Sequence, residues 1–262
     1  SHPDVIRCDI AGSLRRGKEV SGDIDFLVSA KESEGIIHAF TTREGILSIL
    51  AAGNTKASVL LGGGIQADLR VVDDSEFASA LAYFTGSKEH NIVMRSRAIS
   101  RGLRLNEYGL FKSKEETRDP KLRLKSKTEE DIFTALGMVY VPPELREDRG
   151  EFEAGENNGI PKLIEWTDLK GSLHNHSNWS DGHESLEKIA AHMSALGCAY
   201  WAITDHSKAS FQANGLDAAR VKKQLKAIVE VNQKLKDDGD DFRLLTGIEV
   251  DVLKKGLDLK DD

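Results

Sequence analysis

Hydrophobic and polar residues in the first half of the chain predict strands that alternate with glycine-rich turns. Residues 6–11 form a predicted strand that leads into the turn Gly12-Ser13, and residues 26–28 belong to a second strand. Residues 59–72 predict a hairpin-like element around three consecutive glycines. Residues 34–52 carry apolar positions at helical spacing, which predicts a packed helix.

The second half predicts a regular alternation of strands and helices. Strands are expected at residues 169–173, 199–204 and 242–248, and helices at 185–196 and 216–235. An order of β-α-β-α-β implies a parallel sheet or barrel. An eight-stranded β/α barrel needs about 250 residues, so this part can supply only its first strands.

Carboxylates lie on two of the predicted strands. Asp23 and Asp25 are two residues apart, so both side chains face the same side of a strand. Adjacent carboxylates repel each other unless a hard cation lies between them, which indicates a Mg²⁺ site. Asp68, on the second arm of the hairpin-like element, supplies a third carboxylate for two-metal phosphoryl transfer. The structural alternative is an Asx-type strand opening with a solvated Asp68.

Groups suited to phosphate precede these carboxylates. The turn Gly12-Ser13 can bring backbone N–H groups close to a phosphate. Arg15 and Arg16 follow it, and their planar guanidinium groups suit phosphate oxygens. The glycines at 62–64 lack the Lys-Ser/Thr of a P-loop and are interpreted as a turn.

Histidines and acids follow the predicted strands of the second half. His174 and His176 are two residues apart at a strand tip and can bind one metal together. Asp181, His206 and Glu249 add oxygen and nitrogen ligands, a set suited to Zn²⁺, Mn²⁺ or Fe²⁺ and to water activation. Such folds place their sites at the carboxyl ends of strands, so these positions predict a metal cluster.

Charge is distributed unevenly along the chain, whose net charge is −7. Residues 88–127 hold 12 Lys or Arg against 5 Asp or Glu, which favours a surface for a polyanion. The alternative is a solvated charged helix face. Residues 148–162 have the composition of a linker. The two cysteines, Cys8 and Cys198, lack metal-type spacing, which fits a reducing cytosol.

Taken together, the motifs resemble a known family. Similarity to the family X DNA polymerases, the polymerase beta group, rests on Gly12-Ser13-x-Arg15-Arg16-Gly17, Gly22-Asp23-Ile24-Asp25, Asp68, Tyr83-Phe84-Thr85-Gly86-Ser87, Asn91, Arg95 and Leu105–Leu110. Similarity to the PHP metal-dependent hydrolases rests on His174-x-His176, Ser180-Asp181-Gly182, Asp205-His206 and Gly247-x-Glu249. In this order the motifs resemble the bacterial PolX group.

The resemblance implies a two-domain protein of α/β and α+β class. It implies a partial nucleotidyltransferase-like palm at residues 1–80, a thumb at 81–147, a linker at 148–168, and the first part of a PHP (β/α) barrel at 169–262. An N-terminal lyase-like domain and the later PHP ligands have no counterpart in the sequence. An internal fragment is therefore expected, with weak stability over residues 165–262 and neither activity complete.

The resemblance also assigns roles to particular residues. Catalysis and Mg²⁺ binding fall to Asp23, Asp25 and Asp68. The residues assigned to nucleotide binding are Gly12, Ser13, Arg16, Gly22, Tyr83, Phe84, Gly86 and Asn91. Those assigned to DNA binding are Lys88, Arg95, Arg97 and Arg101. A Mn²⁺ or Zn²⁺ cluster in the PHP part is assigned to His174, His176, Asp181, His206 and Glu249.

The implied function is a template-directed DNA polymerase that fills gaps in DNA repair, joined to a PHP 3′–5′ exonuclease or phosphoesterase. Its partners would be gapped or primed duplex DNA and deoxynucleoside triphosphates. The expected protein is a cytoplasmic, nucleoid-associated monomer without a membrane segment. One alternative is that only the PHP part is catalytic and the palm holds DNA. Another is a non-enzymatic DNA-binding protein with structural metals.

Overall fold

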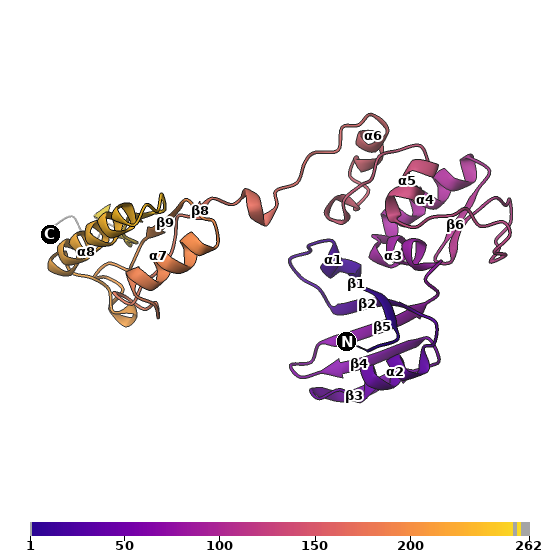
Figure 1. Ribbon diagram of the computed structural model, residues 1–262, viewed down its shortest axis with the longest axis horizontal. Helices are drawn as coiled ribbons and strands as arrows, with labels where there is room; N and C mark the ends of the chain where they lie inside the picture. Colours follow the sequence, from indigo (N-terminus) through magenta and orange to yellow (C-terminus); the bar gives the residue numbers. More distant parts are fainter. Residues whose placement is uncertain (1, 254–255, 258–262) are drawn as a thin grey trace. The chain divides into compact units, whose positions relative to one another are not determined.

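Five strands of the computed structural model form one mixed sheet in the first part of the chain (Figure 1). In spatial order these strands are β1 (Val5–Ala11), β2 (Asp23–Ala30), β5 (Gln66–Val72), β4 (Lys56–Leu61) and β3 (Ile46–Ala52). Strands β2 and β5 run parallel, and the other neighbouring pairs are antiparallel. The structure describes residues 2–253 and 256–257, so the end of the expected PHP-like segment lies outside the described residues.

The two faces of this sheet are covered by different helices. Val28 and Ala30 of β2 pack with Ile36 and Ile37 of α2 (Glu34–Thr41). On the opposite face, Leu27 packs with residues of α3 (Phe77–Thr85). Successive residues of a strand point to opposite faces, so Asp23 and Asp25 share the face of Leu27. The acidic residues therefore face the α3 side of the sheet.

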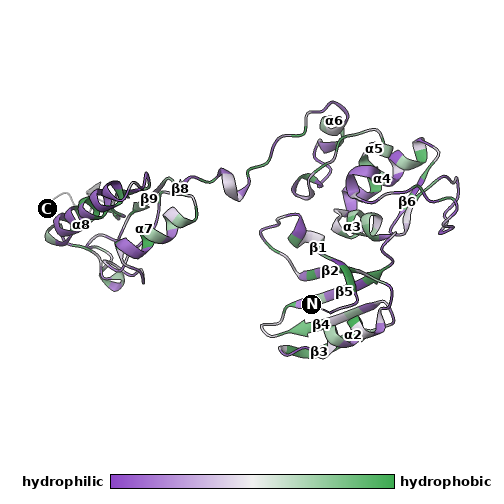
Figure 2. Ribbon diagram, viewed as in Figure 1, coloured by the Kyte–Doolittle hydropathy of each residue, from purple (hydrophilic) through white to green (hydrophobic). Residues whose placement is uncertain are grey.

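The helix predicted over residues 34–52 is confirmed in its first part and wrong in its second part. Its first part forms α2, but Ile46–Ala52 forms edge strand β3, paired with β4. Gly45 has a φ of 91° and lies between the two elements, where a positive φ suits glycine. In Figure 2 both β3 and β4 are coloured as mostly hydrophobic.

Helices and one short hairpin follow the sheet. These elements are α4 (Lys88–Ser100), the hairpin β6 (Arg104–Asn106) and β7 (Gly109–Phe111), α5 (Glu129–Ala135), the 3₁₀ helix η1 (Pro143–Leu145) and α6 (Glu151–Glu156). Their shared core includes Leu110, Ile132, Phe133 and Leu136, none of which is exposed. Lys88, Glu89 and His90 form the first turn of α4.

The stretch expected as a linker is partly folded onto these helices. Glu151 of α6 is buried and pairs with His90 of α4, with Oε1 2.8 Å from Nδ1. The ring of Phe152 stacks on His90 at a centroid distance of 4.8 Å. Val139 also donates its N–H to the carbonyl of Gly155. Residues 151–156 therefore belong to the packed part of the first unit.

The chain divides into two units, Ser1–Pro161 and Lys162–Asp262. The second contains η2 (Trp166–Asp168), β8 (Gly171–Ser172), α7 (Leu186–Ala195), β9 (Tyr200–Ile203), η3 (Phe211–Ala213), α8 (Ala218–Asp237), β10 (Arg243–Thr246), β11 (Val252–Leu253) and β12 (Gly256–Leu257). Strands β8, β9 and β10 form a parallel sheet in the order β10-β9-β8, as the sequence predicts.

The core of the second unit lies between this sheet and the two helices. Ile203 and Leu244 of the sheet pack with Leu186 of α7 and with Ile228 of α8. Figure 2 shows hydrophilic and hydrophobic residues alternating along α8, as in a helix with one buried face. None of the helices in the described part of the chain has the length and apolar character that crossing a bilayer requires.

Two candidate metal centres

Three aspartates converge on the sheet of the first unit. Asp25 of β2 and Asp68 of β5 are direct partners in the parallel register, and Asp23 lies two residues before Asp25. One carboxylate oxygen from each lies within 4.8 Å of the others. Strand pairing thus brings together the three carboxylates that the sequence suggested.

The electrostatics of this cluster favour a cation. Burial raises the pKa of Asp25, and the neighbouring charges of Asp23 and Asp68 raise it further. Lys56 and Arg16 act in the opposite direction without cancelling the rise. All the donor atoms are carboxylate oxygens, the ligands that Mg²⁺ prefers, so the residues fit a divalent ion.

Glycine is required beside the aspartates. A Cβ atom at Gly12 would lie 2.0 Å from Oδ2 of Asp25, and the φ of Gly12 is 65°. Both the close approach and the positive φ exclude other side chains without a rearrangement. Gly12 begins α1 (Gly12–Arg15), so this glycine lets the helical turn lie against the carboxylate.

The two arginines that follow have different environments. Arg15 donates to both oxygens of Glu129, at 3.0 and 2.6 Å, so it joins the turn to α5. Arg16 donates through Nε to Glu147 at 2.8 Å and through Nη1 to the carbonyl of Thr85 at 2.6 Å. Ser13 hydrogen bonds to the hydroxyl of Ser21 at 3.1 Å. Of the two arginines, only Arg16 remains a candidate for phosphate.

Glu129 is the centre of a buried ionic group that the sequence analysis missed. Arg146, with no exposed surface, donates at 2.6 Å to Oε1 of Glu129, an oxygen that also accepts from Arg15. Burial opposes ionisation of Glu129, but the hydrogen bond from Arg15 and the charge of Arg146 outweigh it and lower the pKa. The partners of Glu129 lie 114 and 17 residues away along the chain, so no local motif indicates them.

Four of the residues assigned to the nucleotide, Tyr83, Phe84, Gly86 and Asn91, lie around the start of α4. The rings of Tyr83 and Phe84 meet edge to face with centroids 5.2 Å apart. Asn91 donates its Nδ2 to the carbonyl of Tyr83 at 2.7 Å. Gly86 has a φ of 72°, and a Cβ there would lie 3.2 Å from Nη1 of Arg16. Gly22 has open space around it, since a Cβ there would meet no atom of the described residues within 4 Å.

The four basic residues assigned to DNA are not equivalent. Lys88, Arg95 and Arg101 are exposed. Arg97 instead donates to the carbonyls of Leu136 and Gly137, at 2.7 and 3.2 Å, and pairs with Glu156 of α6. Arg97 is therefore held by contacts within the fold, whereas the charged groups of the other three lie at the surface.

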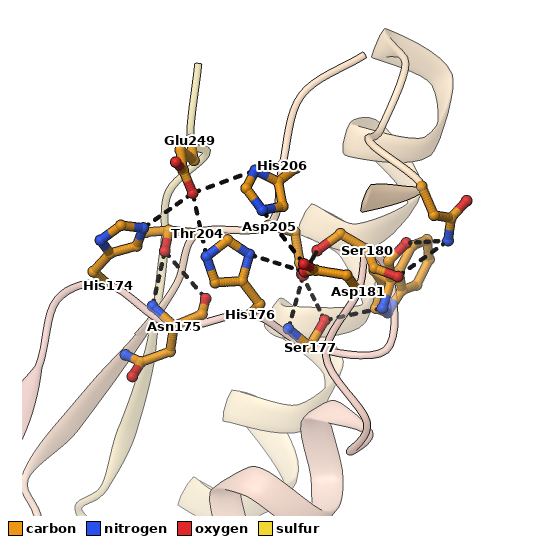
Figure 3. A network of polar contacts seen from close by, with 12 residues as sticks. His174, Asn175, His176, Ser177, Ser180, Asp181, Thr204, Asp205, His206 and Glu249 are labelled. Atoms are coloured by element: carbon orange, nitrogen blue, oxygen red, sulfur yellow. Dashed lines mark hydrogen bonds and ion pairs between the residues drawn. The ribbon is translucent and has the colours of Figure 1, made fainter. Parts of the chain in front are cut away.

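In the second unit, the predicted ligands meet at the carboxyl ends of the parallel strands. His174 and His176 follow β8, His206 follows β9, and Glu249 follows β10. Asn175, between the first two histidines, fixes them to β9 by donating Nδ2 to the carbonyl of Ala202 at 3.0 Å. The imidazoles point toward Glu249 in Figure 3.

Two overlapping groups of donors result. His174 Nε2 lies 3.0 Å, and His176 Nε2 3.2 Å, from Oε2 of Glu249. Asp181 lies 3.3 Å from Nδ1 of His176 and 3.6 Å from Nε2 of His206. The ligand atoms of His174, His176 and Glu249 lie within 4.8 Å of one another, and so do those of His176, Asp181 and His206.

The donor chemistry fits a transition metal. Nδ1 of His176 is buried and makes no hydrogen bond to the described residues, although Asp181 is nearby, which suits a nitrogen that binds a cation. The hydrogen bond with His174 lowers the pKa of Glu249, and electrostatic interactions with His206 and His176 lower it further. Imidazole and carboxylate ligands together suit Zn²⁺, Mn²⁺ or Fe²⁺.

Comparison with known families matches both units. The DNA polymerase beta palm matches residues 2–78, the DNA polymerase beta thumb matches residues 80–147, and the PHP domain matches residues 172–260. The DNA polymerase/3′-5′ exonuclease PolX of Bacillus subtilis (strain 168) is 38% identical over 98% of this chain. Repair DNA polymerase X of African swine fever virus (isolate Warthog/Namibia/Wart80/1980) is 30% identical over 52% of this chain and 78% of its own length.

The chain belongs to the bacterial PolX group of family X DNA polymerases. The family and the fold class expected from the motifs are thereby confirmed. This PolX chain spans 44% of the length of the Bacillus subtilis relative. A crystal structure of Leishmania infantum polymerase beta, a ternary P/T complex, is 29% identical and covers 55% of this chain and 68% of its own, with a TM-score of 0.48. The PolX domains imply dependence on divalent metal ions.

Proposed function

We propose that this chain combines a DNA polymerase site with a PHP phosphoesterase site that acts as a 3′–5′ exonuclease. The palm would occupy residues 1–80, the thumb 81–147, the linker 148–168 and the PHP part 169–262, with residues 151–156 of the linker packed on the first unit. The convergence of Asp23, Asp25 and Asp68 is the observation that carries the polymerase assignment. The substrates would be gapped or primed duplex DNA and deoxynucleoside triphosphates, which would place the protein at the bacterial nucleoid.

The polymerase site would hold Mg²⁺ between Asp23, Asp25 and Asp68. Bound there, the ions would lower the pKa of a primer 3′-hydroxyl and neutralise charge on the leaving pyrophosphate. Arg16 would hold the triphosphate through its guanidinium group, next to the backbone N–H groups of Gly12 and Ser13. These groups orient the nucleotide, and orientation supplies much of the catalysis in phosphoryl transfer.

Other residues of the first unit would select and place the substrates. Tyr83 and Phe84 would flank the sugar, and Asn91, which already contacts the carbonyl of Tyr83, would reach the base. Gly22 and Gly86 would allow close approach of the nucleotide, because neither has a side chain. Exposed Lys88, Arg95 and Arg101 would contact the DNA backbone, with Arg97 reaching it only by leaving its present partners.

The phosphoesterase site would hold Mn²⁺ or Zn²⁺ between His174, His176, Asp181, His206 and Glu249. Metal bound there would polarise a phosphodiester and activate water. The ring nitrogens of the histidines already face the carboxylates of Asp181 and Glu249, so the ligand atoms lie close together before a metal binds. Both His174 and Asp181 are exposed, so the 3′ end of a single strand could reach the ligands from solvent.

Two substitutions on the intact chain separate the assignments. Asp25→Ala should reduce extension of a gapped duplex with Mg²⁺ on the order of 10³-fold or more and leave cleavage with Mn²⁺ unchanged. His174→Ala should reduce cleavage with Mn²⁺ by a similar factor and leave extension with Mg²⁺ unchanged. Matched controls are Asp9→Ala on the neighbouring strand and His192→Ala on α7, both of which alter exposed residues. Extension that survives Asp25→Ala would reduce the palm to a DNA-holding module, and cleavage that survives His174→Ala would remove the phosphoesterase assignment.

A further inference from the structure

Behind the second metal centre lies a carboxylate that is not among the proposed ligands. Asp205 has no exposed surface and accepts hydrogen bonds from Ser177, Ser180 and Gln224 (Figure 3). Ser177 donates its backbone N–H at 2.7 Å and its hydroxyl at 2.5 Å, and the hydroxyl of Ser180 donates at 2.5 Å. The carboxamide of Gln224 supplies the fourth at 2.5 Å. These four donors are neutral groups.

The donors occupy particular places along the chain. Ser177 directly follows His176, and Ser180 directly precedes Asp181. Asp205 itself directly precedes His206. Asp205 and the two serines that it binds are therefore the immediate chain neighbours of three proposed ligands. These ligands form one of the two donor groups, that of His176, Asp181 and His206.

The fourth donor, Gln224, connects α8 to the loop that runs from His176 to Asp181 (the ligand loop). Gln224 is 3% exposed and lies one turn after Arg220, in the first half of the helix. Arg220 donates to the carbonyl of Trp179, in the ligand loop, and to that of Asn214 at 2.9 Å. Two successive turns of α8 thus hold the stretch between His176 and Asp181.

The loop has little freedom to find another arrangement. A Cβ atom at Gly182 would lie 2.5 Å from the carbonyl oxygen of His176. Asn214, with a φ of 55°, donates to the carbonyls of Trp179 and Ser180 at 3.2 Å. A loop fixed at so many points keeps its ends at constant separation, which a metal site requires of its ligands.

We propose that Asp205 and Gln224 are positioning residues that set the spacing of His176, Asp181 and His206 for metal binding. The inference rests on the proposed phosphoesterase site and adds to it two residues outside the ligand set. A buried acceptor that loses a donor is left unsatisfied, and the loop moves to relieve it. Loss of such a partner behind a ligand typically weakens metal binding about 10–100-fold.

The test measures binding of Co²⁺ alone to the chelator-treated full chain, in a background carrying Asp25→Ala so that the palm does not contribute. Gln224→Leu removes the carboxamide at similar size, and Ser180→Ala removes a hydroxyl. Each should weaken Co²⁺ binding about 10-fold or more and change the visible absorption that reports ligand geometry. Ser180→Thr keeps the hydroxyl and should recover most of the affinity.

Gln233→Leu is the matched control. Gln233 lies on the same helix, is exposed, and donates to Asp237 one turn away, so its loss should leave Co²⁺ binding unchanged. The proposal is overturned if Gln224→Leu lowers the melting temperature of the metal-free protein but leaves Co²⁺ affinity and absorption as in the parent chain. A parent chain that binds no Co²⁺ would remove the phosphoesterase proposal itself, together with this inference, so the two failures are distinguishable.

Discussion

The aspartates of the first unit come from two paired strands, whereas the ligands of the second come from loops that follow three parallel strands. In the first unit, the register of β2 and β5 places Asp25 beside Asp68 without help from a loop. In the second, a short pairing of His206 with Glu249 extends the sheet, and the position of Asp181 depends on a turn. Backbone pairing therefore fixes one centre, and side-chain hydrogen bonds fix much of the other.

The surroundings of the two centres also differ in charge. Near the palm aspartates, a buried ionic group of Arg15, Glu129 and Arg146 joins α1 to α5. Behind the second centre, neutral hydroxyl and carboxamide groups surround Asp205. Removing one member of a buried ionic group leaves an unpaired charge, which costs more than the loss of a neutral donor.

The pKa values of Asp25 in the first centre and Glu249 in the second are shifted in opposite directions. Burial and then like charges raise the pKa of Asp25, whereas histidines lower the pKa of Glu249. Without a cation, the three aspartates of the first cluster repel one another, whereas the acids of the second cluster face histidines. The palm should therefore depend on divalent ions for its own stability more than the PHP part does.

The largest effect is expected from Glu129→Ala. Arg146 is fully buried and would lose its carboxylate, and breaking a buried pair typically costs about 3–5 kcal/mol. For a unit of this size, that loss corresponds to a melting temperature lower on the order of 10 °C. Differential scanning calorimetry of the full chain should show the transition of the first unit shifted and that of the second unchanged.

Glu130→Ala is the matched control, since Glu130 is the next residue of α5 and is exposed. It should move neither transition measurably. If Glu129→Ala proved as mild as Glu130→Ala, the ionic group would be dispensable, and the contrast between charged and neutral supports would be lost.

The second prediction concerns pH and Mg²⁺. The pKa of Asp25 is raised in the folded state, so its contribution to stability is fully present below the ordinary carboxyl pKa and is lost as pH rises through the raised value. Asp25→Asn removes this loss and should raise the melting temperature of the metal-free first unit at neutral pH. It should also remove the stabilisation by Mg²⁺, which is about 2.7 kcal/mol at about 100 times its Kd.

The measurement compares thermal melting of parent and variant from about pH 3, below the ordinary carboxyl pKa, to about pH 8, with chelator and with Mg²⁺. The difference between the two proteins isolates this carboxylate from other titrating groups, including Glu129, whose pKa is shifted downward. Equal Mg²⁺ stabilisation in both proteins would show that the ions bind elsewhere.

Much of the first centre could be predicted because its signals are local. Alternation along a strand places Asp23 and Asp25 on one side, and the apolar residues around Asp68 mark a second strand, which the structure pairs in parallel with the first. The edge strand Ile46–Ala52 was predicted wrongly, because a short apolar run suits a helix and a strand equally well. Its assignment depends on pairing with β4, a partner that periodicity does not reveal.

The supporting residues could not be predicted for a different reason. Glu129 follows a helix cap and Gln224 lies among lysines of a long helix, where polar residues usually face solvent. Their partners are 114 residues away at Arg15 and 19 residues away at Asp205. Sequence motifs reveal the residues that perform chemistry, but tertiary packing decides which polar residues hold them.

The smallest effect is expected from Glu147→Gln. Glu147 accepts from Nε of Arg16 at 2.8 Å and lies 3.5 Å from Nζ of Lys18. It therefore pairs with two positive charges that would otherwise be available to a triphosphate. A partly exposed pair of this kind is worth about 0.2–1 kcal/mol. Releasing Arg16 should therefore lower the KM for a deoxynucleoside triphosphate by at most about fivefold, with kcat unchanged.

Steady-state extension of a primed duplex measures this effect, and Glu144→Gln, which alters an exposed acid on the preceding 3₁₀ helix η1, is the control. The hydrogen bond from Arg16 to the carbonyl of Thr85 remains in the variant, so the guanidinium stays near its present position. A KM that rises in Glu147→Gln would mean that Glu147 orients Arg16 for the nucleotide and does not compete with it. The surroundings of the palm would then resemble those of Asp205, with an acid that positions the binding group from behind.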